Sequence, residues 1–343
     1  MPLAGLLPDT TLVDVLLVVV ATAVIWLGSG WLESSAEDLA AVYGLPAVVQ
    51  GSVVVAIGSS FPELASVLVA ALAGAFDLGV GAVVGSAIFN ILVIPALSGL
   101  AVDGPLETNR ALVFKEAQFY MVAVSALVVT FSLAVIYEPV PGAALQGELT
   151  RPLAAVPLLL YALYVFIQWQ DVSDHEAPEA GDVPVRRAWA LLAAGLLLIL
   201  VAVELLVGSV ESLSHTFDVP AFLAGVTVVA AATSLPDTLV SVRSAADDRA
   251  ATSLGNVLGS NTFDLLVAIP LGVLVAGTAP VDFAVAVPMF AVLTLATVLL
   301  FLFLRTDLSV TTAEAATLLL AYVLFVAWVV AETAGATDLI RGA

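Results

Sequence analysis

Long apolar runs dominate this chain and follow one another with little polar sequence between them. Ten of these segments are long enough to cross a bilayer as a helix. They show no strict alternation of apolar and polar residues, which argues against the strands of an outer-membrane barrel. The ten predicted spans cover residues 11–32, 46–76, 78–101, 112–137, 152–170, 187–212, 220–246, 250–277, 281–304 and 311–333.

The composition also indicates a helical integral membrane protein. Of the 343 residues, 62% are hydrophobic and 11% are charged, whereas a soluble domain has roughly half and a quarter. The absence of cysteine excludes disulfides and thiolate metal sites, and two histidines are too few for a histidine-built zinc site. Nine basic residues cannot form a nucleic-acid surface. The net charge of −20 falls at span ends and in loops, which favours salt-rich surroundings and a halophilic source.

The basic residues predict how the chain sits in the cell membrane. If both termini lie outside, seven basic residues fall on the inner side and two on the outer side, as the positive-inside rule requires. The inner set is Arg110, Lys115, Arg186, Arg187, Arg243, Arg249 and Arg305, and the outer set is Arg151 and Arg341.

The chain contains an internal duplication at a fixed offset of 174 residues. GSSFPE at 58–63 matches ATSLPD at 232–237, and GSAIFN at 85–90 matches GSNTFD at 259–264. Between residues 51 and 92, thirteen of 42 positions are identical to their counterparts, against roughly a tenth expected by chance.

The duplication predicts an inverted architecture. Equivalent points are separated by five spans, and because five is odd, the two copies cross the membrane in opposite directions. Transporters with such repeats hold their substrate near the midplane, between broken helices. The prediction is an all-α membrane protein with ten helices in two inverted five-helix repeats, residues 1–170 and 187–343. A short acidic loop, 171–186, joins them, and spans two and seven are expected to be broken.

Four polar residues stand near the middle of otherwise uncharged spans. Glu63, Asp237 and Asp264 are acids, and Asn90 is the repeat counterpart of Asp264. A carboxylate at that depth costs at least about 2.5–3.5 kcal/mol, so the three acids need partners, protons or bound cations.

Proline and small residues around these acids predict further oxygen ligands. Pro62 and Pro236 have no N–H to donate within the helix, so carbonyl groups are freed near Ser59 and Thr233. The Gly-Ser pairs at 85–86 and 259–260 allow close helix approach and add the hydroxyls of Ser86 and Ser260. Hard cations such as Ca²⁺ and Na⁺ require this set of oxygens.

A structural interpretation of the same residues competes with this one. Ser60-x-x-Glu63 and Ser234-x-x-Asp237 have the spacing of helix capping boxes. Capping accounts for neither Asp264 nor the duplicated Asn90 position.

The two motif pairs resemble those of the cation/Ca²⁺ antiporter superfamily and, within it, the sodium/calcium exchangers, over almost the whole chain. The resemblance implies that Glu63 and Asp237 are the central Ca²⁺ ligands, completed by Ser59 and Thr233. It implies that Na⁺ uses the same acids together with a further set: the carbonyls of Ala56 and Ala230, and Ser86, Ser260, Asn90 and Asp264. Ser60 and Ser234 match less specifically.

The expected function is secondary active antiport of Na⁺ against Ca²⁺ by alternating access, with both ions competing for one carboxylate-lined site. An H⁺/Ca²⁺ exchanger or a K⁺-dependent Na⁺/Ca²⁺ exchanger on the same scaffold stays open. A passive cation channel is disfavoured because the acids form inverted pairs rather than a ring. No enzymatic activity, cofactor, nucleic acid or protein partner is expected. The lipid bilayer is the surroundings, Ca²⁺ and Na⁺ are the substrates, and one copy suffices for transport.

Overall fold

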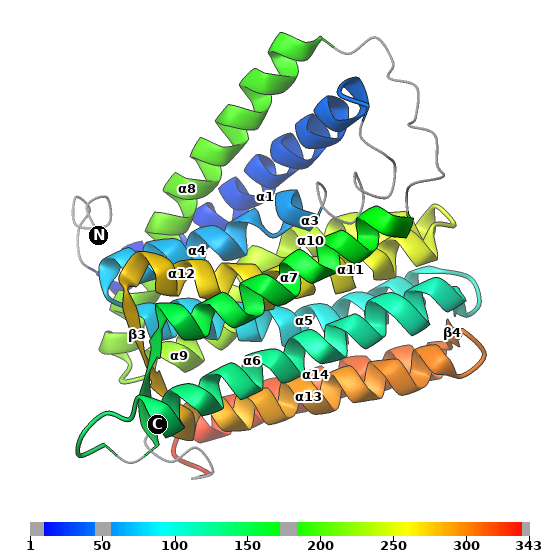
Figure 1. The fold of residues 1–343 in the computed structure, drawn as a ribbon. Helices are drawn as coiled ribbons and strands as arrows, with labels where there is room; N and C mark the ends of the chain where they lie inside the picture. Colours follow the sequence, from blue (N-terminus) through cyan, green and yellow to red (C-terminus); the bar gives the residue numbers. More distant parts are fainter. Residues whose placement is uncertain (1–9, 45–55, 144, 172–183, 338–343) are drawn as a thin grey trace.

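Helices make up nearly all of the computed structural model, which describes residues 10–44, 56–143, 145–171 and 184–337 (Figure 1). Within these ranges, nine helical segments are long and apolar enough to cross a membrane, and Phe61–Ala73 is a shorter apolar helix. The predicted second span, 46–76, lies partly outside the described residues. The expected all-helical membrane fold is confirmed.

The helices fall into two sets, one before and one after residues 172–183, which lie outside the described ranges. The first set is α1 (Thr11–Val42), α3 (Ala56–Ser59), α4 (Phe61–Ala73), α5 (Phe76–Ala101), the π-helical segment η3 (Leu112–Glu116), α6 (Ala117–Tyr137) and α7 (Arg151–Asp171). The second set is α8 (Val185–Thr216), α9 (Ala221–Ala224), η4 (Gly225–Val229), α10 (Ala230–Ala246), α11 (Ala250–Phe263), η5 (Asp264–Ala268), α12 (Ile269–Ala276), α13 (Phe283–Arg305) and α14 (Thr312–Thr333).

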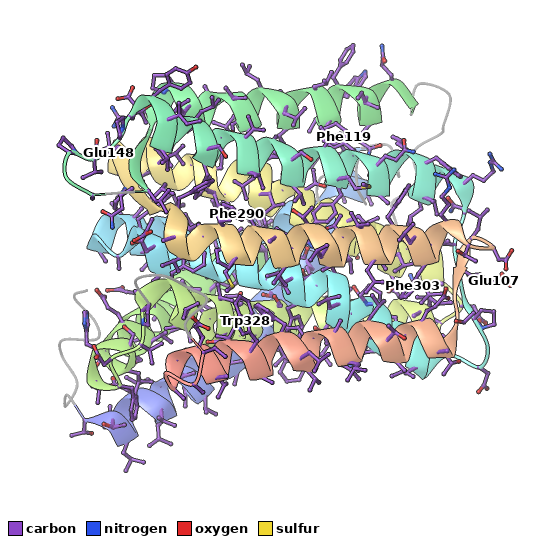
Figure 2. All side chains as sticks on the ribbon, turned by 90° about the horizontal axis from the view of Figure 1, so that it is seen from below. Glu107, Phe119, Glu148, Phe290, Phe303 and Trp328 are labelled. Carbon is purple, nitrogen blue, oxygen red and sulfur yellow. The ribbon has the colours of Figure 1, made fainter. Side chains whose placement is uncertain are left out.

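The centre of the molecule is formed by α5 and by the stretch Ala250–Ala276. In the most apolar part of each, 89% of the residues are buried, against 22% in α1, α7 and α14. The outer helices expose large apolar side chains such as Leu159 and Leu295. In Figure 2, Glu107 and Glu148 lie at opposite ends, and Phe290 and Trp328 lie between them. An apolar belt with acids at both ends suits a bilayer.

Helices α1 and α8 form a separate antiparallel pair, inclined to the other helices in Figure 1. Ser212 donates to Asp14 over 2.9 Å at one end of the pair, and Trp189 donates to Tyr43 over 3.3 Å at the other. Each helix has 32 residues, more than the predicted 11–32 and 187–212 and more than one straight crossing needs.

Two short antiparallel ribbons join the two sets of helices crosswise. β1 (Leu106–Glu107), between α5 and α6, pairs with β4 (Ser309–Val310), between α13 and α14. β2 (Gln146–Thr150), between α6 and α7, pairs with β3 (Thr278–Asp282), between α12 and α13. Figure 1 shows β3 and β4 at opposite ends of the bundle. The hydropathy pattern predicts neither ribbon, because both lie in loops.

The central helices cross at glycines. A Cβ atom on Gly81 or Gly85 of α5 would lie 2.2 Å from the carbonyl oxygen of Phe222 or Val226. A Cβ atom on Gly225 would lie 2.2 Å from the Leu78 oxygen. Backbones can approach this closely only without side chains, so this crossing sets how near α5 comes to α9, η4 and α10.

The helix irregularities differ between the two repeats. In the first, Ser60 forms a turn that separates α3 from α4, as the Pro62 motif predicts. In the second, α10 continues through Pro236, and the irregularity is the π-helical η4, which ends seven residues earlier. The second repeat has another π-helical segment, η5, which begins at Asp264, and the first repeat has η3. Single π-helical turns of this kind frequently mark functional sites.

Candidate cation site

The predicted acids lie at the centre of the helix bundle. Glu63 is in the first turn of α4, Asp237 is in α10 and Asp264 starts η5. Each is at most 1% exposed, and so is Asn90 of α5. The structure thus places all four predicted polar centres in the buried core.

The two halves make equivalent hydrogen bonds to the two central acids. Ser86 donates to Glu63 Oε1 over 3.1 Å, and Ser260 donates to Asp237 Oδ2 over 3.0 Å. Residues 86 and 260 are repeat counterparts, as are 63 and 237. The duplication found in the sequence therefore appears as a pseudo-two-fold arrangement of side chains.

Each of these serines also contacts a serine of the other half. Ser86 Oγ lies 2.7 Å from Ser234 Oγ, and Ser260 Oγ lies 2.6 Å from Ser60 Oγ. Ser60 also donates to the backbone oxygen of Ser260 over 3.3 Å. These contacts form two relays, one of Ser234, Ser86 and Glu63 and one of Ser60, Ser260 and Asp237.

The capping-box interpretation is wrong for both motifs. Ser60 precedes α4, but its side chain makes no capping hydrogen bond and contacts Ser260 instead. Ser234 lies inside α10, where no helix begins. The two serines therefore connect the halves rather than starting helices.

Ser59 and Thr233 face the acid of the opposite half. The Thr233 side chain interacts with Glu63, and that of Ser59 with Asp237. The Thr233 hydroxyl also lies 3.1 Å from the Val229 oxygen and 3.3 Å from the Ala230 oxygen. The Ala230 carbonyl is thus at the site, but a side chain of its own helix already engages it. Ala56 is the first residue of α3.

Asn90 connects the site to a residue that the motifs do not single out. Its Nδ2 lies 3.0 Å from Asn261 Oδ1 and 3.5 Å from Asp237 Oδ2. Asn261 donates to the oxygen of Ala87, its own repeat counterpart, over 3.2 Å and to the Tyr120 hydroxyl over 3.4 Å. The sequence signal for Asn261 is weak, because the counterpart position holds alanine.

Five buried acceptor oxygens at the site have no hydrogen-bond partner among the described residues. They are Glu63 Oε2, Asp237 Oδ1, Asn90 Oδ1 and both carboxylate oxygens of Asp264. Asp264 is near enough to Glu63 and Asp237 to interact with both electrostatically. Buried acceptors without donors are costly, and a bound cation would satisfy them.

Carboxylates alone do not enclose a metal position here. Across the described ranges, no three Asp, Glu, His or Cys side chains converge closely enough to hold an ion by themselves. Hydroxyl, amide and backbone oxygens must complete any coordination, which suits hard cations with mixed oxygen ligands.

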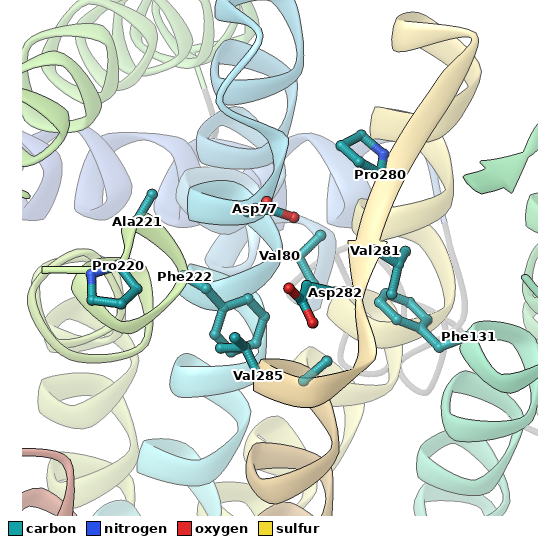
Figure 3. A pocket seen from close by; sticks show the side chains of 11 residues that line it. Asp77, Val80, Phe131, Pro220, Ala221, Phe222, Pro280, Val281, Asp282 and Val285 are labelled. Carbon is teal, nitrogen blue, oxygen red and sulfur yellow. The ribbon is translucent and has the colours of Figure 1, made fainter. Parts of the chain in front are cut away.

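A separate cavity lies away from these acids. Its volume is about 180 Å³, and Asp77 and Asp282 line it with Phe131, Pro220 and Phe222 (Figure 3). Asp77 follows the end of α4, whereas Glu63 is at its start, about 15 Å away along the helix. This cavity is not part of the central site.

Apolar spans around a buried, pseudo-symmetric set of acids, hydroxyls and amides define a cation transporter of the membrane. The chain belongs to the sodium/calcium exchanger family, because the family model described as sodium/calcium exchanger protein matches residues 13–170 and 187–331. Its class is that of cation/Ca²⁺ antiporters, and its family and fold are those of ion transporters.

Known proteins support both the family and the fold. The solved structure of the sodium-calcium exchanger NCX_Mj with Na⁺ and Sr²⁺ superposes with a TM-score of 0.63 at 24% identity, over 93% of this chain and 99% of that one. The inner membrane protein YrbG of Escherichia coli is 26% identical over 76% of this chain and 79% of its own length. Human sodium/potassium/calcium exchanger 3 is 29% identical over 38% of this chain and 18% of its own length. The inverted-repeat fold is thus that of NCX_Mj.

Proposed function

We propose that this protein exchanges Na⁺ for Ca²⁺ across the cell membrane by alternating access. The supporting observation is the set of five unpartnered acceptor oxygens buried between the two inverted repeats. Ca²⁺ is the cargo with the higher charge density and would bind Glu63 and Asp237, with Ser59 and Thr233 completing its coordination. Carboxylate, hydroxyl and carbonyl oxygens are its ordinary ligands.

Sodium would compete for the same acids. We assign it Ser86, Ser260, Asn90 and Asp264, which surround them, and the carbonyls of Ala56 and Ala230. An empty site carries uncompensated buried charge, which makes reorientation without an ion costly. Competition for one site together with this cost makes exchange obligatory.

Neutralising either central acid tests the assignment. Glu63→Gln and Asp237→Asn should each abolish Na⁺-driven ⁴⁵Ca²⁺ uptake into proteoliposomes, because each removes a charge that must balance Ca²⁺. Glu107→Gln, an exposed acid on β1, should keep uptake at the wild-type level. Wild-type uptake by both central variants would refute the site.

Potassium is the second candidate coupling ion, favoured by the similarity to sodium/potassium/calcium exchanger 3 and by the fully buried Asp264. Imposing Na⁺, K⁺ and pH gradients one at a time on the same vesicles separates the alternatives. Uptake that needs internal Na⁺ alone favours Na⁺/Ca²⁺ exchange, and uptake that also needs K⁺ or follows only ΔpH favours the K⁺-dependent or H⁺ alternative. Flux with no counter-ion would indicate a channel.

Residues 1–170 and 187–343 form the two repeats in this proposal. Both termini lie outside the cell, as the inner surplus of basic residues favours. The β1–β4 ribbon then faces the cytoplasm and the β2–β3 ribbon the exterior. A single copy contains both halves of the site and needs no protein partner.

A further inference from the structure

Glu33 is a buried acid that the duplicated motifs do not include. It lies in α1, is 8% exposed, and its Oε1 has no hydrogen-bond partner among the described residues. Its Cγ lies 3.8 Å from the position a Cβ would take on Gly58, so the side chain runs over the helix break next to Ser59. It is also near enough to Asp237 to interact electrostatically.

Two more polar residues, one on α10 and one on α11, have unsatisfied buried atoms among the described residues. Ser241 lies one turn beyond Asp237 on α10, is fully buried, and its Oγ has no partner in the described ranges. Asn256 lies one turn before Ser260 on the adjoining α11. Its amide nitrogen and oxygen are both buried and have no hydrogen-bond partner in the described ranges. Helix α10 packs against both α1 and α11. These three residues supply a carboxylate, a hydroxyl and an amide oxygen.

The three residues lie on one side of the central site. Glu37, one turn beyond Glu33, is exposed and interacts with Arg249, at the turn between α10 and α11. That turn and β1 line the same hollow, whose volume is about 510 Å³, so they lie side by side. The polar residues therefore lie between Asp237 and the face that carries the β1–β4 ribbon.

The repeat counterparts of these three residues, toward the opposite side, are apolar. At the offset of 174, the counterparts of Glu33, Ser241 and Asn256 are Val207, Val67 and Ala82, and all three are fully buried and apolar. Symmetry of the fold alone would give both sides the same polarity. At these three positions the two sides differ in polarity, which points to a role specific to the side with Glu33.

We propose that Glu33, with Ser241 and Asn256, forms a staging site where a Ca²⁺ or Na⁺ ion is held between the β1–β4 face and the central acids. The inference rests on the proposed cation exchange. A lone carboxylate on the approach raises the local cation concentration, as charged clefts do. The counterpart positions toward the β2–β3 side are apolar, so the apparent affinity for Ca²⁺ should differ between the two faces.

Sided transport measurements test the staging site. The measurement uses sealed vesicles of both orientations and the variant Glu33→Val, which introduces the residue found at the counterpart position 207. This change should raise the half-saturating Ca²⁺ concentration at the β1–β4 face roughly three- to tenfold. The value at the β2–β3 face and the maximal rate should stay within about twofold of wild type. Glu211→Gln, on the counterpart helix α8, should leave the β1–β4 value unchanged. Equal shifts at both faces, or none, would overturn the proposal.

A binding measurement separates this inference from the exchange function. Mn²⁺ binding followed by electron paramagnetic resonance uses purified protein in which Glu63→Gln and Asp237→Asn have disabled the central site. Weak Mn²⁺ binding should persist and should be lost when Glu33→Gln is added. Equal Mn²⁺ binding with and without Glu33 overturns the staging site even if exchange is demonstrated. Loss of binding supports the site even if wild-type protein shows no Na⁺-driven flux.

Discussion

At the scale of single residues, Asn261 holds the two halves of the site in register. Its amide accepts from Asn90 and donates to the Ala87 carbonyl and to Tyr120. Three of its contacts therefore fall on α5 and α6, across the pseudo-two-fold arrangement. A side chain with this role orients Asn90 without itself presenting a free oxygen to an ion.

Asn261→Ala should raise the half-saturating Ca²⁺ concentration roughly tenfold, because leaving buried polar partners unsatisfied costs about 1–3 kcal/mol. The matched control is Thr262→Val. The Thr262 hydroxyl donates to the Leu258 carbonyl of its own helix over 2.7 Å, so its removal should change the half-saturating concentration less than twofold. Ca²⁺-dependent uptake rates across a concentration series give both numbers. An Asn261→Ala protein with wild-type affinity contradicts the orienting role.

The sequence contains enough information to predict the four polar centres, because an ionisable residue inside an apolar span is conspicuous. It could not predict the relay partners, since Ser60 and Ser234 have equally good capping spacing. Asn261 has no distinctive sequence pattern either, because it is an amide near an acid, and only the fold brings Ala87 and Tyr120 against it.

At the scale of helices, the crossing of α5 with η4 decides whether the two repeats can share one site. Gly85 precedes Ser86, and its Cα faces the Val226 carbonyl. Any side chain at 85 must push the backbones apart. Such a shift would lengthen the Ser86–Ser234 contact of 2.7 Å and break the hydrogen-bonded connection from Ser234 to Glu63.

Gly85→Ala should therefore lower the thermal unfolding midpoint in detergent and reduce ⁴⁵Ca²⁺ uptake to under roughly a tenth, because overpacking of a tight core costs about 1–3 kcal/mol. Gly30→Ala is the control. Gly30 lies in α1 and a Cβ there meets nothing within 4 Å, so this change should preserve uptake and leave the midpoint unchanged or raised. Wild-type uptake by Gly85→Ala would show that the crossing tolerates separation.

Helix existence was predictable from hydropathy, but the form of the helix irregularities was not. Pro62 does accompany a turn at Ser60, whereas Pro236 is accommodated inside α10 and the distortion falls in η4. The same proline motif therefore has different local structure in the two copies, with a turn at Ser60 and continuous helix at Ser234. No sequence rule places the π-helical η5 at Asp264.

At the scale of the whole molecule, the two ribbons mark opposite ends of the bundle. Glu107 on β1 and Glu148 on β2 are both exposed and lie at opposite ends in Figure 2. The chain has no cysteine of its own, so a single introduced thiol can be followed without background.

Glu148→Cys should react with a membrane-impermeant maleimide in intact cells, because the proposed orientation puts β2 outside. Glu107→Cys should react only in inverted vesicles or after lysis. Mass shift on a gel reports both reactions, and a cysteine at 148 that is protected in intact cells would reverse the orientation. Labelling of both positions from one side contradicts the transmembrane arrangement itself.

The ribbons also constrain how a protein of this form could have arisen. β1 and β3 occupy equivalent loops of the two repeats, as do β2 and β4, yet each pairs with a strand of the other repeat. One repeat by itself would leave both of its strands without partners, and a second copy inserted upside down would complete them. The strand pairing is therefore the one that an antiparallel homodimer of a single repeat would form.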